Sequence, residues 1–173
     1  MKISNVVILV MALGGIQCMS VAQALPRHLT VNASGACQSS LPVFDVQIRK
    51  RPLAVQNEGT APAFVTCSYY SVGPYGLTLG VTGVRVYVAT NNKQANTVTC
   101  TGVNGYNDGN AQYVVKSVDV PSSGGQVIMD WTPADFVNPL GPTLPYSNFN
   151  INCNLNPGTG INQTEIHYQD ADV

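Results

Sequence analysis

The sequence predicts an all-β fold, an antiparallel β-sandwich of the jelly-roll or Ig-like Greek-key type with two disulfides. The first observation is the stretch Phe149–Asn156, in which apolar and asparagine side chains alternate without interruption. A period of two is typical of a strand with one buried face, and asparagine is a poor strand former, so burial of the apolar face must stabilise it. The second is an even number of cysteines after an export signal. The third is a low charged fraction (10%) with 16 glycines and 11 prolines, which is typical of a chain with many turns.

Residues 1–24 have the pattern of a secretory signal peptide. Lys2 supplies a positive charge, residues 6–13 are apolar, and Ala22 and Ala24 are the small residues expected before a cleavage site. The apolar run is shorter than the roughly 20 residues that a membrane-spanning helix needs. We therefore expect cleavage after Ala24 rather than a membrane anchor, and no stable membrane insertion of the mature chain.

The mature chain has a length suited to one domain. We expect an N-terminal segment over 25–36, followed by a single sandwich domain over 37–173. In the N-terminal segment Leu29, Val31 and Ala33 alternate with polar residues, which predicts a first strand or a frayed terminus. A donor strand that completes the sheet of a neighbouring subunit is the alternative.

Four cysteines remain once Cys18 leaves with the signal peptide: Cys37, Cys67, Cys100 and Cys153. In an exported chain an even number indicates disulfides, and four cysteines allow three pairings. We predict the pairs Cys37–Cys67 and Cys100–Cys153, the second because both cysteines lie on the inward faces of their strands. A zinc site is disfavoured because no two cysteines have the short spacing of a zinc knuckle. We predict no metal and no other cofactor.

Runs with one apolar face predict the strands of the sandwich. In chain order they are Val43–Ile48, Ala63–Tyr70, Leu77–Val81, Val84–Val88, Thr97–Val103, Gln112–Val120, Gln126–Trp131, Phe149–Asn156 and Ile161–Tyr168. In the first run we expect Phe44, Val46 and Ile48 to point inward. Val84–Val88 and Thr97–Val103 are expected to form a hairpin.

The connections between these runs carry clear turn signals. Asn104–Asn110 contains Asn-Gly and Asp-Gly, which favour the positive φ of tight turns. It has a faint likeness to a calcium loop, but a single carboxylate does not hold calcium tightly. Thr132 and Pro133 are suited to the start of one helical turn. Trp131 is expected in the core.

The composition excludes several classes of function. With 8 basic and 9 acidic residues, the chain has no basic surface for nucleic acid. Neither His28 nor His167 has a local acid or nucleophile beside it, which argues against a nucleophilic triad. A glycosidase needs two carboxylates across a cleft, and nothing in the sequence pairs Glu58 or Glu165 with a partner. We predict that the protein is not an enzyme.

The polar side of the alternating stretch is the candidate ligand surface. Asn150, Asn152, Asn154 and Asn156 would stand about 6.5–7 Å apart along one strand face. Each amide both donates and accepts hydrogen bonds, which suits the hydroxyls of a sugar. The alternative is a solvated sheet face whose polarity prevents aggregation.

Other outward residues are expected to extend this surface. Thr97, Thr99 and Thr101 would join it if their strand lies beside the asparagine strand. Tyr87 and Tyr106 would add aromatic rings for stacking.

Several landmarks of the chain resemble small exported β-sandwich proteins of Gram-negative bacteria. They are the four cysteines, Asn152-Cys153 and Pro157-Gly158. The resemblance covers most of the mature chain and implies no particular function or functional residue. The chain is also distantly similar to fimbrial subunits in size, export and strand content. It departs from them in its four cysteines and in the ending Gln169–Val173.

We therefore expect a secreted or periplasmic, non-catalytic binding or surface module. Its ligand is unknown, and a glycan or another cell-surface component is the first hypothesis. The alternative is a structural subunit of an extracellular fibre or surface layer that self-associates by strand exchange through Leu29–Ser34. A binding module would be a monomer with a saturable ligand, whereas a subunit would form larger species.

Overall fold

The computed structural model describes residues 25–69, 78–106, 108–137, 143–145 and 148–170. The expected signal peptide, residues 1–24, lies outside them. Strands make up nearly all of the regular structure: β1 Leu25–Asn32, β2 Cys37–Ser39, β3 Ile48–Arg51, β4 Ala54–Asn57, β5 Ala63–Tyr69, β6 Thr78–Thr90, β7 Asn96–Asn104, β8 Gln112–Val120, β9 Val127–Trp131, β10 Phe149–Leu155 and β11 Thr159–Asp170. The short helix α1 covers Ala33–Ala36, and 3₁₀ turns cover Pro42–Phe44 and Pro133–Asp135.

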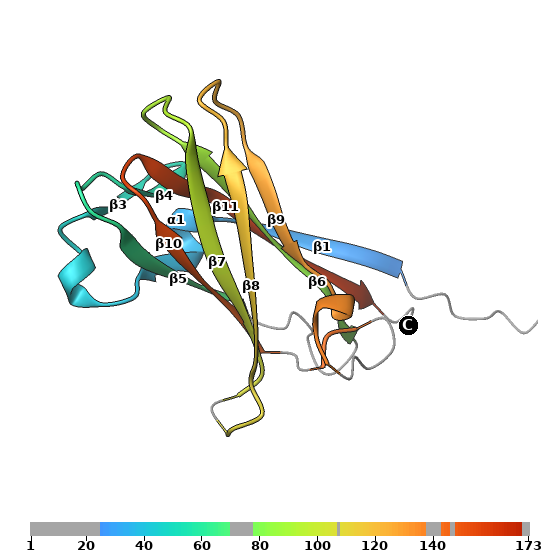
Figure 1. Cartoon of the computed structure of the whole chain (residues 1–173). Coiled ribbons are helices and arrows are strands. Elements are labelled where there is room, and N and C mark those ends of the chain that lie inside the picture. The colour runs from blue at the N-terminus through green and yellow to red at the C-terminus, as the bar shows by residue number, and fades with distance from the viewer. Residues whose placement is uncertain (1–24, 70–77, 107, 138–142, 146–147, 171–173) are drawn as a thin grey trace, which may run out of the picture.

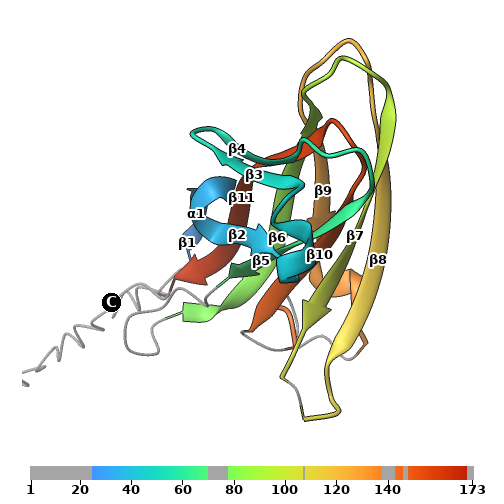
Figure 2. The same cartoon turned by 90° about the vertical axis from the view of Figure 1, so that its left-hand side faces the viewer.

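The strands form two antiparallel sheets that pack face to face, as Figure 1 shows. The six-stranded sheet has the order β3-β4-β11-β6-β9, with β1 also beside β11, and the five-stranded sheet has the order β2-β5-β10-β7-β8. In Figure 2, α1 and the β3–β4 hairpin lie at one side of the sandwich and β8 at the other. The predicted antiparallel β-sandwich is confirmed. Among the described residues no helix is long and apolar enough to cross a membrane.

The alternating stretch forms β10, at the centre of the five-stranded sheet. Its inward residues Phe149, Ile151, Cys153 and Leu155 are completely buried. They face an interior rich in valine, including Val84, which lies on β6 in the opposite sheet. The apolar face therefore fixes a strand that asparagine propensity alone would not form.

Both predicted disulfides are confirmed: Cys37–Cys67 and Cys100–Cys153. In each pair the two cysteines are directly opposite on neighbouring strands, and their Cα atoms are 4.0 Å apart. Both bridges lie within the five-stranded sheet, so they join strands of one sheet and do not tie the two sheets together. All four cysteines are buried.

The strand predicted over Val43–Ile48 is wrong. A 3₁₀ turn covers Pro42–Phe44, and β3 begins only at Ile48. Pro42 stands at the start of that turn, where its fixed φ favours a helical conformation. Ile48 is buried as expected, but Val46 is 74% exposed.

The predicted hairpin of Val84–Val88 with Thr97–Val103 is also wrong. These segments lie in β6 and β7, which belong to different sheets. The hairpin partner of β7 is β8, joined to it through the turn predicted near Gly105 and Gly109, both of which have positive φ. An alternating pattern identifies the buried face of a strand but not the neighbour it pairs with.

Trp131 lies in the core, as expected, and its side chain crosses the interior between the two sheets. It is completely buried, and its Nε1 donates a hydrogen bond of 3.0 Å to the carbonyl oxygen of Val114 on β8. The helical turn predicted after it is present at Pro133–Asp135. There the Asp135 carboxylate accepts a 2.7 Å hydrogen bond from the backbone N–H of Thr132, which closes the N-terminus of the turn.

Strand β1 lies on the edge of the six-stranded sheet. It pairs with β11 over eight residues, from Leu25 opposite Asp170 to Asn32 opposite Gln163. None of its eight residues is fully buried, and Leu29 and Val31 remain 42% and 37% exposed, so backbone pairing contributes more to holding it than burial of side chains.

Candidate functional site

The asparagine face lies on the outside of the five-stranded sheet, in the middle of three neighbouring strands. Asn152 is directly opposite Thr66 on β5 and Thr101 on β7, and Asn154 is directly opposite Phe64 and Thr99. The asparagine strand β10 and the threonine strand β7 are therefore neighbours in the sheet, as expected. Next to β7, β8 adds a fourth strand to the same face.

A shallow hollow of about 500 Å³ lies on this face, a size within the usual range of small-molecule sites. Four strands contribute to it, so it runs across the sheet and not along one strand. Its lining residues are Phe64, Thr99, Thr101, Val103, Tyr113, Asn152 and Asn154. We call it the sheet hollow.

Two asparagines of the predicted row offer free hydrogen-bonding capacity in the sheet hollow. The side-chain carbonyl oxygens of Asn152 and Asn154 are buried and accept no hydrogen bond from the described residues. A buried acceptor without a partner is costly. Rotation of each amide about χ2 would bring its oxygen to the surface of the hollow, where a ligand hydroxyl that donates to it would relieve that cost.

The other two asparagines of the row are engaged in the fold. Asn156 Nδ2 donates to the side-chain oxygen of Asn96 and to the carbonyl oxygen of Thr97, both at 2.9 Å. Asn150 Nδ2 makes a long contact of 3.4 Å with the side chain of Asn148. Neither lines the sheet hollow, so the predicted row divides into a central pair that lines it and two flanking residues that do not.

Two aromatic rings stand at opposite corners of the sheet hollow. Phe64 is 42% exposed and Tyr113 is 68% exposed. Their strands are three spacings apart and the residues are four positions out of register, which separates their backbones by about 14 Å across the sheet and about 13 Å along it. The ring of Phe44 packs against Phe64 with centroids 5.8 Å apart, which restrains the Phe64 ring. Exposed aromatic rings on a strand face are typical of binding surfaces.

Of the three threonines predicted on β7, Thr99 and Thr101 line the sheet hollow and Thr97 does not. Thr99 Oγ1 and Ser117 Oγ on β8 share a hydrogen bond of 2.7 Å. Thr101 is opposite Val115, which is apolar and 63% exposed. The hollow therefore combines hydroxyl and amide groups with apolar surface, the mixture expected of a site for an amphipathic ligand.

The expectation that Tyr87 belongs to this surface is wrong. Tyr87 lies on β6 of the six-stranded sheet, and its hydroxyl donates a 2.5 Å hydrogen bond to Glu165. The physical reason is that β6 and β7 belong to different sheets, so the outward face of β6 and the outward face of β7 lie on opposite sides of the sandwich. Tyr106 is 49% exposed just beyond β7 and is not part of the hollow's lining.

The residues that line the sheet hollow carry no formal charge at neutral pH. The nearby carboxylate of Asp119 accepts a hydrogen bond from Thr97 at 2.7 Å. The side chain of Lys116 lies on the inner face of β8, and its Nζ forms an ion pair with Oδ1 of Asp135 at 2.8 Å. Burial opposes ionisation of Asp135, but the hydrogen bond from Lys116 and those from Thr132 prevail and lower its pKa.

A metal role has no support in the residues that the structure describes. Among them no group of three or more histidine, cysteine, aspartate or glutamate side chains could hold a metal ion. The Asn104–Asn110 turn instead uses its carboxylate internally, since Asp108 Oδ1 accepts a 3.0 Å hydrogen bond from the backbone N–H of Asn110.

Sequence reasoning missed Phe64, Val103 and Tyr113 as members of the surface. For Phe64 a signal existed, because placing Val65 and Cys67 inward leaves Phe64 outward. Tyr113 is harder to assign, because its strand has apolar residues on both faces. Only the strand order brings these residues to the face that carries the asparagines.

No protein-family model matches the chain, and no curated protein matches it. Among solved structures, the chain is similar to an exo-β-1,3-galactanase from Phanerochaete chrysosporium with galactose, at 14% identity over 81% of this chain and a TM-score of 0.42. The chain spans only 29% of that enzyme's length.

Two similar structures are comparable to this chain in length. One is a family 11 carbohydrate-binding module from Clostridium thermocellum in complex with a mixed-linked β-1,3-1,4 tetrasaccharide, with 14% identity, 84% and 89% of the two chains covered and a TM-score of 0.39. The other is the N-terminal cellulose-binding domain of β-1,4-glucanase C from Cellulomonas fimi, with 17% identity, 80% and 88% covered and a TM-score of 0.36. At these identities and TM-scores the similarity supports no inference about a ligand.

Proposed function

We propose that the protein is an exported, non-catalytic module that binds a neutral glycan chain in the sheet hollow. The observation that carries the proposal is the juxtaposition of free amide oxygens on Asn152 and Asn154 with the exposed rings of Phe64 and Tyr113. Sugars present apolar C–H faces and polar hydroxyl edges. Aromatic rings bind the apolar C–H faces by stacking, and amides bind the hydroxyl edges by hydrogen bonds.

The dimensions of the hollow favour an extended oligosaccharide over a single sugar. Phe64 and Tyr113 lie at its opposite corners, and Asn152 and Asn154 lie between them. A chain lying diagonally across β5, β10, β7 and β8 would contact both rings and both amides. The lining carries no formal charge at neutral pH, which favours a neutral chain over a polyanion or polycation.

Two features support the non-catalytic and exported parts of the proposal. General acid–base chemistry needs a titratable group with a pKa near the working pH, and among the described residues Tyr113 is the only titratable side chain that lines the hollow. The disulfides Cys37–Cys67 and Cys100–Cys153 suit an oxidising compartment, either the periplasm or the exterior of the cell.

The test is affinity electrophoresis of the oxidised protein in gels that contain soluble neutral polysaccharides, followed by calorimetry on any that retard it. We expect retardation by at least one neutral polysaccharide and none by polygalacturonate, which is charged. Retention that persists in a Phe64→Ala, Tyr113→Ala double variant would place binding elsewhere. Binding to polygalacturonate alone would refute the neutral-ligand proposal.

A second candidate function is supported by one observation on β1. A structural subunit that exchanges strands needs a terminal strand that can leave its own sheet at low cost, and no side chain of β1 is fully buried. Light scattering behind size exclusion, comparing the full mature chain with a form starting at Cys37, would test it. Larger species that depend on residues 25–36 would favour the subunit, and monomers in both would exclude it.

A further inference from the structure

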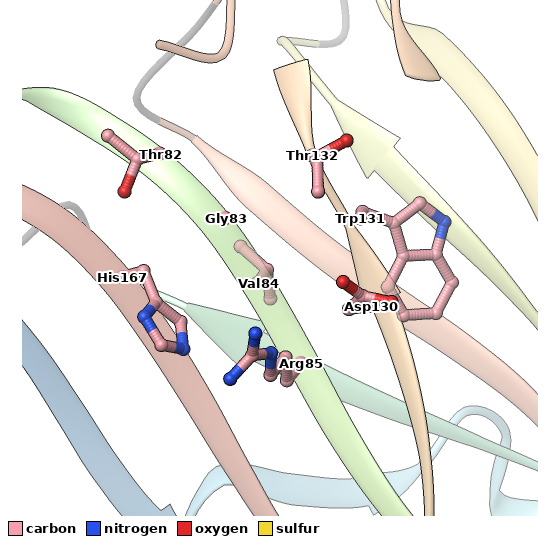
Figure 3. Close-up of a pocket in the computed structure, with 8 residues that line it drawn as sticks. All are labelled: Thr82, Gly83, Val84, Arg85, Asp130, Trp131, Thr132 and His167. Atoms are coloured by element: carbon pink, nitrogen blue, oxygen red, sulfur yellow. The ribbon is translucent and has the colours of Figure 1, made fainter. Parts of the chain in front are cut away.

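A small notch lies on the outer face of the six-stranded sheet, on the opposite side of the sandwich from the sheet hollow. Figure 3 shows its lining: residues 82–85 of β6, residues 130–132 at the end of β9, and His167 of β11. Its volume is about 140 Å³. We call it the Gly83 notch, and its size suits part of one small molecule rather than a polymer.

Gly83 creates the space in this notch. On β6, Gly83 lies directly opposite His167 of the neighbouring strand β11. The next residue, Val84, lies directly opposite Trp131 of β9, the neighbouring strand on the other edge of β6. A side chain at position 83 would stand on the outer face between β11 and β9. Because glycine has none, the surrounding polar groups border a recessed floor, at which Gly83 itself is buried. In Figure 3, Thr82 and Thr132 stand at one end of this floor and Arg85 at the other.

The notch holds a side chain that only donates hydrogen bonds beside a side chain that only accepts them. Arg85 on β6 and Asp130 on β9 are directly opposite each other. The guanidinium offers only N–H donors and the carboxylate only acceptors. Among the described residues these two side chains form no ion pair with each other within 4.0 Å. In Figure 3 the Arg85 guanidinium turns toward His167.

A buried carboxylate holds the side of the notch in place. Glu165 is only 7% exposed, accepts the Tyr87 hydroxyl bond at 2.5 Å, and has Oε1 2.9 Å from Nε2 of His167. Glu165 is therefore committed to the fold by the Tyr87 hydroxyl, and its carboxylate lies beside the ring of His167 at the edge of the notch. The groups left to meet a ligand are Arg85, Asp130, His167 and the two threonine hydroxyls.

The charge balance of the notch decides the class of ligand. Two carboxylates, Asp130 and Glu165, flank one guanidinium, Arg85, so an anion would be repelled by the excess of negative charge. A cation would meet the guanidinium of Arg85, because Arg85 lies between Glu165 and Asp130 in the strand register. Glu165 is already engaged by the Tyr87 hydroxyl. Burial lowers the pKa of His167 from its ordinary value of 6.5, which leaves the imidazole uncharged at neutral pH. A neutral ligand with groups that both donate and accept hydrogen bonds fits best.

We propose that the Gly83 notch is a second binding site, which takes adjacent hydroxyl groups of one neutral sugar unit or another small polyol. One hydroxyl would accept from Arg85 while its neighbour donates to Asp130, and Thr82 and Thr132 would add further hydroxyl contacts. The proposal does not depend on the sheet hollow. If both sites bind, the protein would connect two glycan chains, because the sites lie on opposite faces of the sandwich.

The test is a titration of the oxidised protein, followed by ¹H–¹⁵N correlation spectra. The probes are the methyl glycosides of glucose, galactose and mannose, with glycerol as a minimal polyol and sodium acetate as an anion. We expect at least one neutral probe to shift the backbone amide signals of Gly83, Arg85 and Asp130 in a saturable way. Acetate is expected to leave them unchanged.

Two variants localise the effect. In Gly83→Ala the added Cβ would meet only ordinary contacts, 3.5 Å from the Trp131 carbonyl oxygen and 3.9 Å from the His167 Cβ, so the fold should be retained. The methyl group occupies the floor and should weaken binding of the neutral probe by about tenfold. Thr101→Ala, in the sheet hollow, should not change it.

Three results would overturn the proposal. They are the absence of saturable shifts with any neutral probe, shifts that persist unchanged in Gly83→Ala, and shifts that appear with acetate but not with the polyols. Loss of the shifts in Thr101→Ala would show that the probe binds the sheet hollow instead. Because the readout is residue-specific, failure here is distinguishable from failure of polysaccharide binding in the hollow.

Discussion

The indole of Trp131 on β9 packs directly against the backbone of Gly102 on β7, in the opposite sheet. A Cβ built on Gly102 would lie 2.5 Å from Nε1 of Trp131 and 2.7 Å from its Cδ1. The same Nε1 donates to the carbonyl oxygen of Val114 on β8. The contact lies directly beneath the sheet hollow, since the neighbours of Gly102 along β7, Thr101 and Val103, face outward and line it.

We predict that Gly102→Ala destabilises the protein by about 3 kcal/mol, because the rigid indole must move and its hydrogen bond is strained or lost. The measurement is urea-induced unfolding followed by Trp131 fluorescence. The matched control is Gly35→Ala, where an added Cβ has no atom within 4 Å, and where we expect a change within about 0.5 kcal/mol. Equal stability of the Gly102 variant and the wild type would refute the close-packing argument.

The two disulfides should contribute unequal stability. Loop-entropy arguments give about 4.2 kcal/mol for Cys100–Cys153 and about 3.6 kcal/mol for Cys37–Cys67, whose sequence separations are 53 and 30 residues. We expect the Cys100→Ala, Cys153→Ala variant to unfold at a lower urea concentration than Cys37→Ala, Cys67→Ala. Guanidinium and urea midpoints of both double variants and of the oxidised wild type are the measurement. The reverse order would show that local packing, not loop length, decides the contribution.

The sequence predicted the buried faces well and the neighbours of strands less well. The alternation in Phe149–Leu155 identified the inward side of β10, and the inward positions of Cys100 and Cys153 predicted their pairing. The same pattern could not show that β6 and β7 lie in different sheets, because both strands bury one face in the same interior. Pairing depends on contacts between segments far apart in the chain, which a local period does not report.

In the sheet hollow, too, the sequence predicted which side chains face outward but not which strands lie side by side. The outward position of Asn152 and Asn154 was readable from the period, and so was that of Thr99 and Thr101. The meeting of Phe64 with Asn154 depends on the pairing of β5 with β10, and the entry of Tyr113 depends on the place of β8 beside β7. The commitment of Asn156 to Asn96 and Thr97 depends on atomic positions that no pattern of residue types specifies.

The divided asparagine row gives a prediction with an internal control. Asn152→Ala with Asn154→Ala removes the two amides that lack protein partners, so we expect unchanged unfolding and glycan binding about tenfold weaker. Asn156→Ala removes two hydrogen bonds within the fold and should destabilise by about 1–2 kcal/mol without weakening binding. Unfolding midpoints and calorimetric titration of both variants test this. Unchanged affinity in the double variant would end the role of the asparagine face.

The two aromatic residues at the corners of the sheet hollow should each contribute to the affinity for a glycan. We expect Phe64→Ala and Tyr113→Ala each to weaken glycan binding by about tenfold, since each removes a stacking ring. Tyr113→Phe should retain most of the affinity because it keeps the ring. The control is Ile128→Ala on the six-stranded sheet, whose 48% exposure is close to the 42% of Phe64. An equal loss in the Ile128 variant would point to a general effect of removing surface apolar groups.

The histidine on the opposite face predicts a pH dependence of stability. Burial of the ring lowers the pKa of His167 below 6.5, and the positive Arg85 and the neighbouring His28 lower it further, against the opposing effect of Glu165 and Asp130. The unfolded chain therefore takes up a proton at this position before the folded protein does. Its contribution is fully present above about pH 6.5 and is lost as the pH falls from there through the folded pKa.

We therefore expect wild-type stability to fall more steeply than that of His167→Gln between pH 7 and pH 5, because glutamine cannot take up the proton. Urea midpoints of the two proteins at a series of pH values are the measurement, and their difference removes the contribution of carboxylates that titrate in both. His28→Gln removes the ring whose centroid is 5.9 Å from that of His167 and should make the fall shallower than in the wild type. Parallel curves for all three proteins would show that His167 ionises equally in the folded and unfolded states.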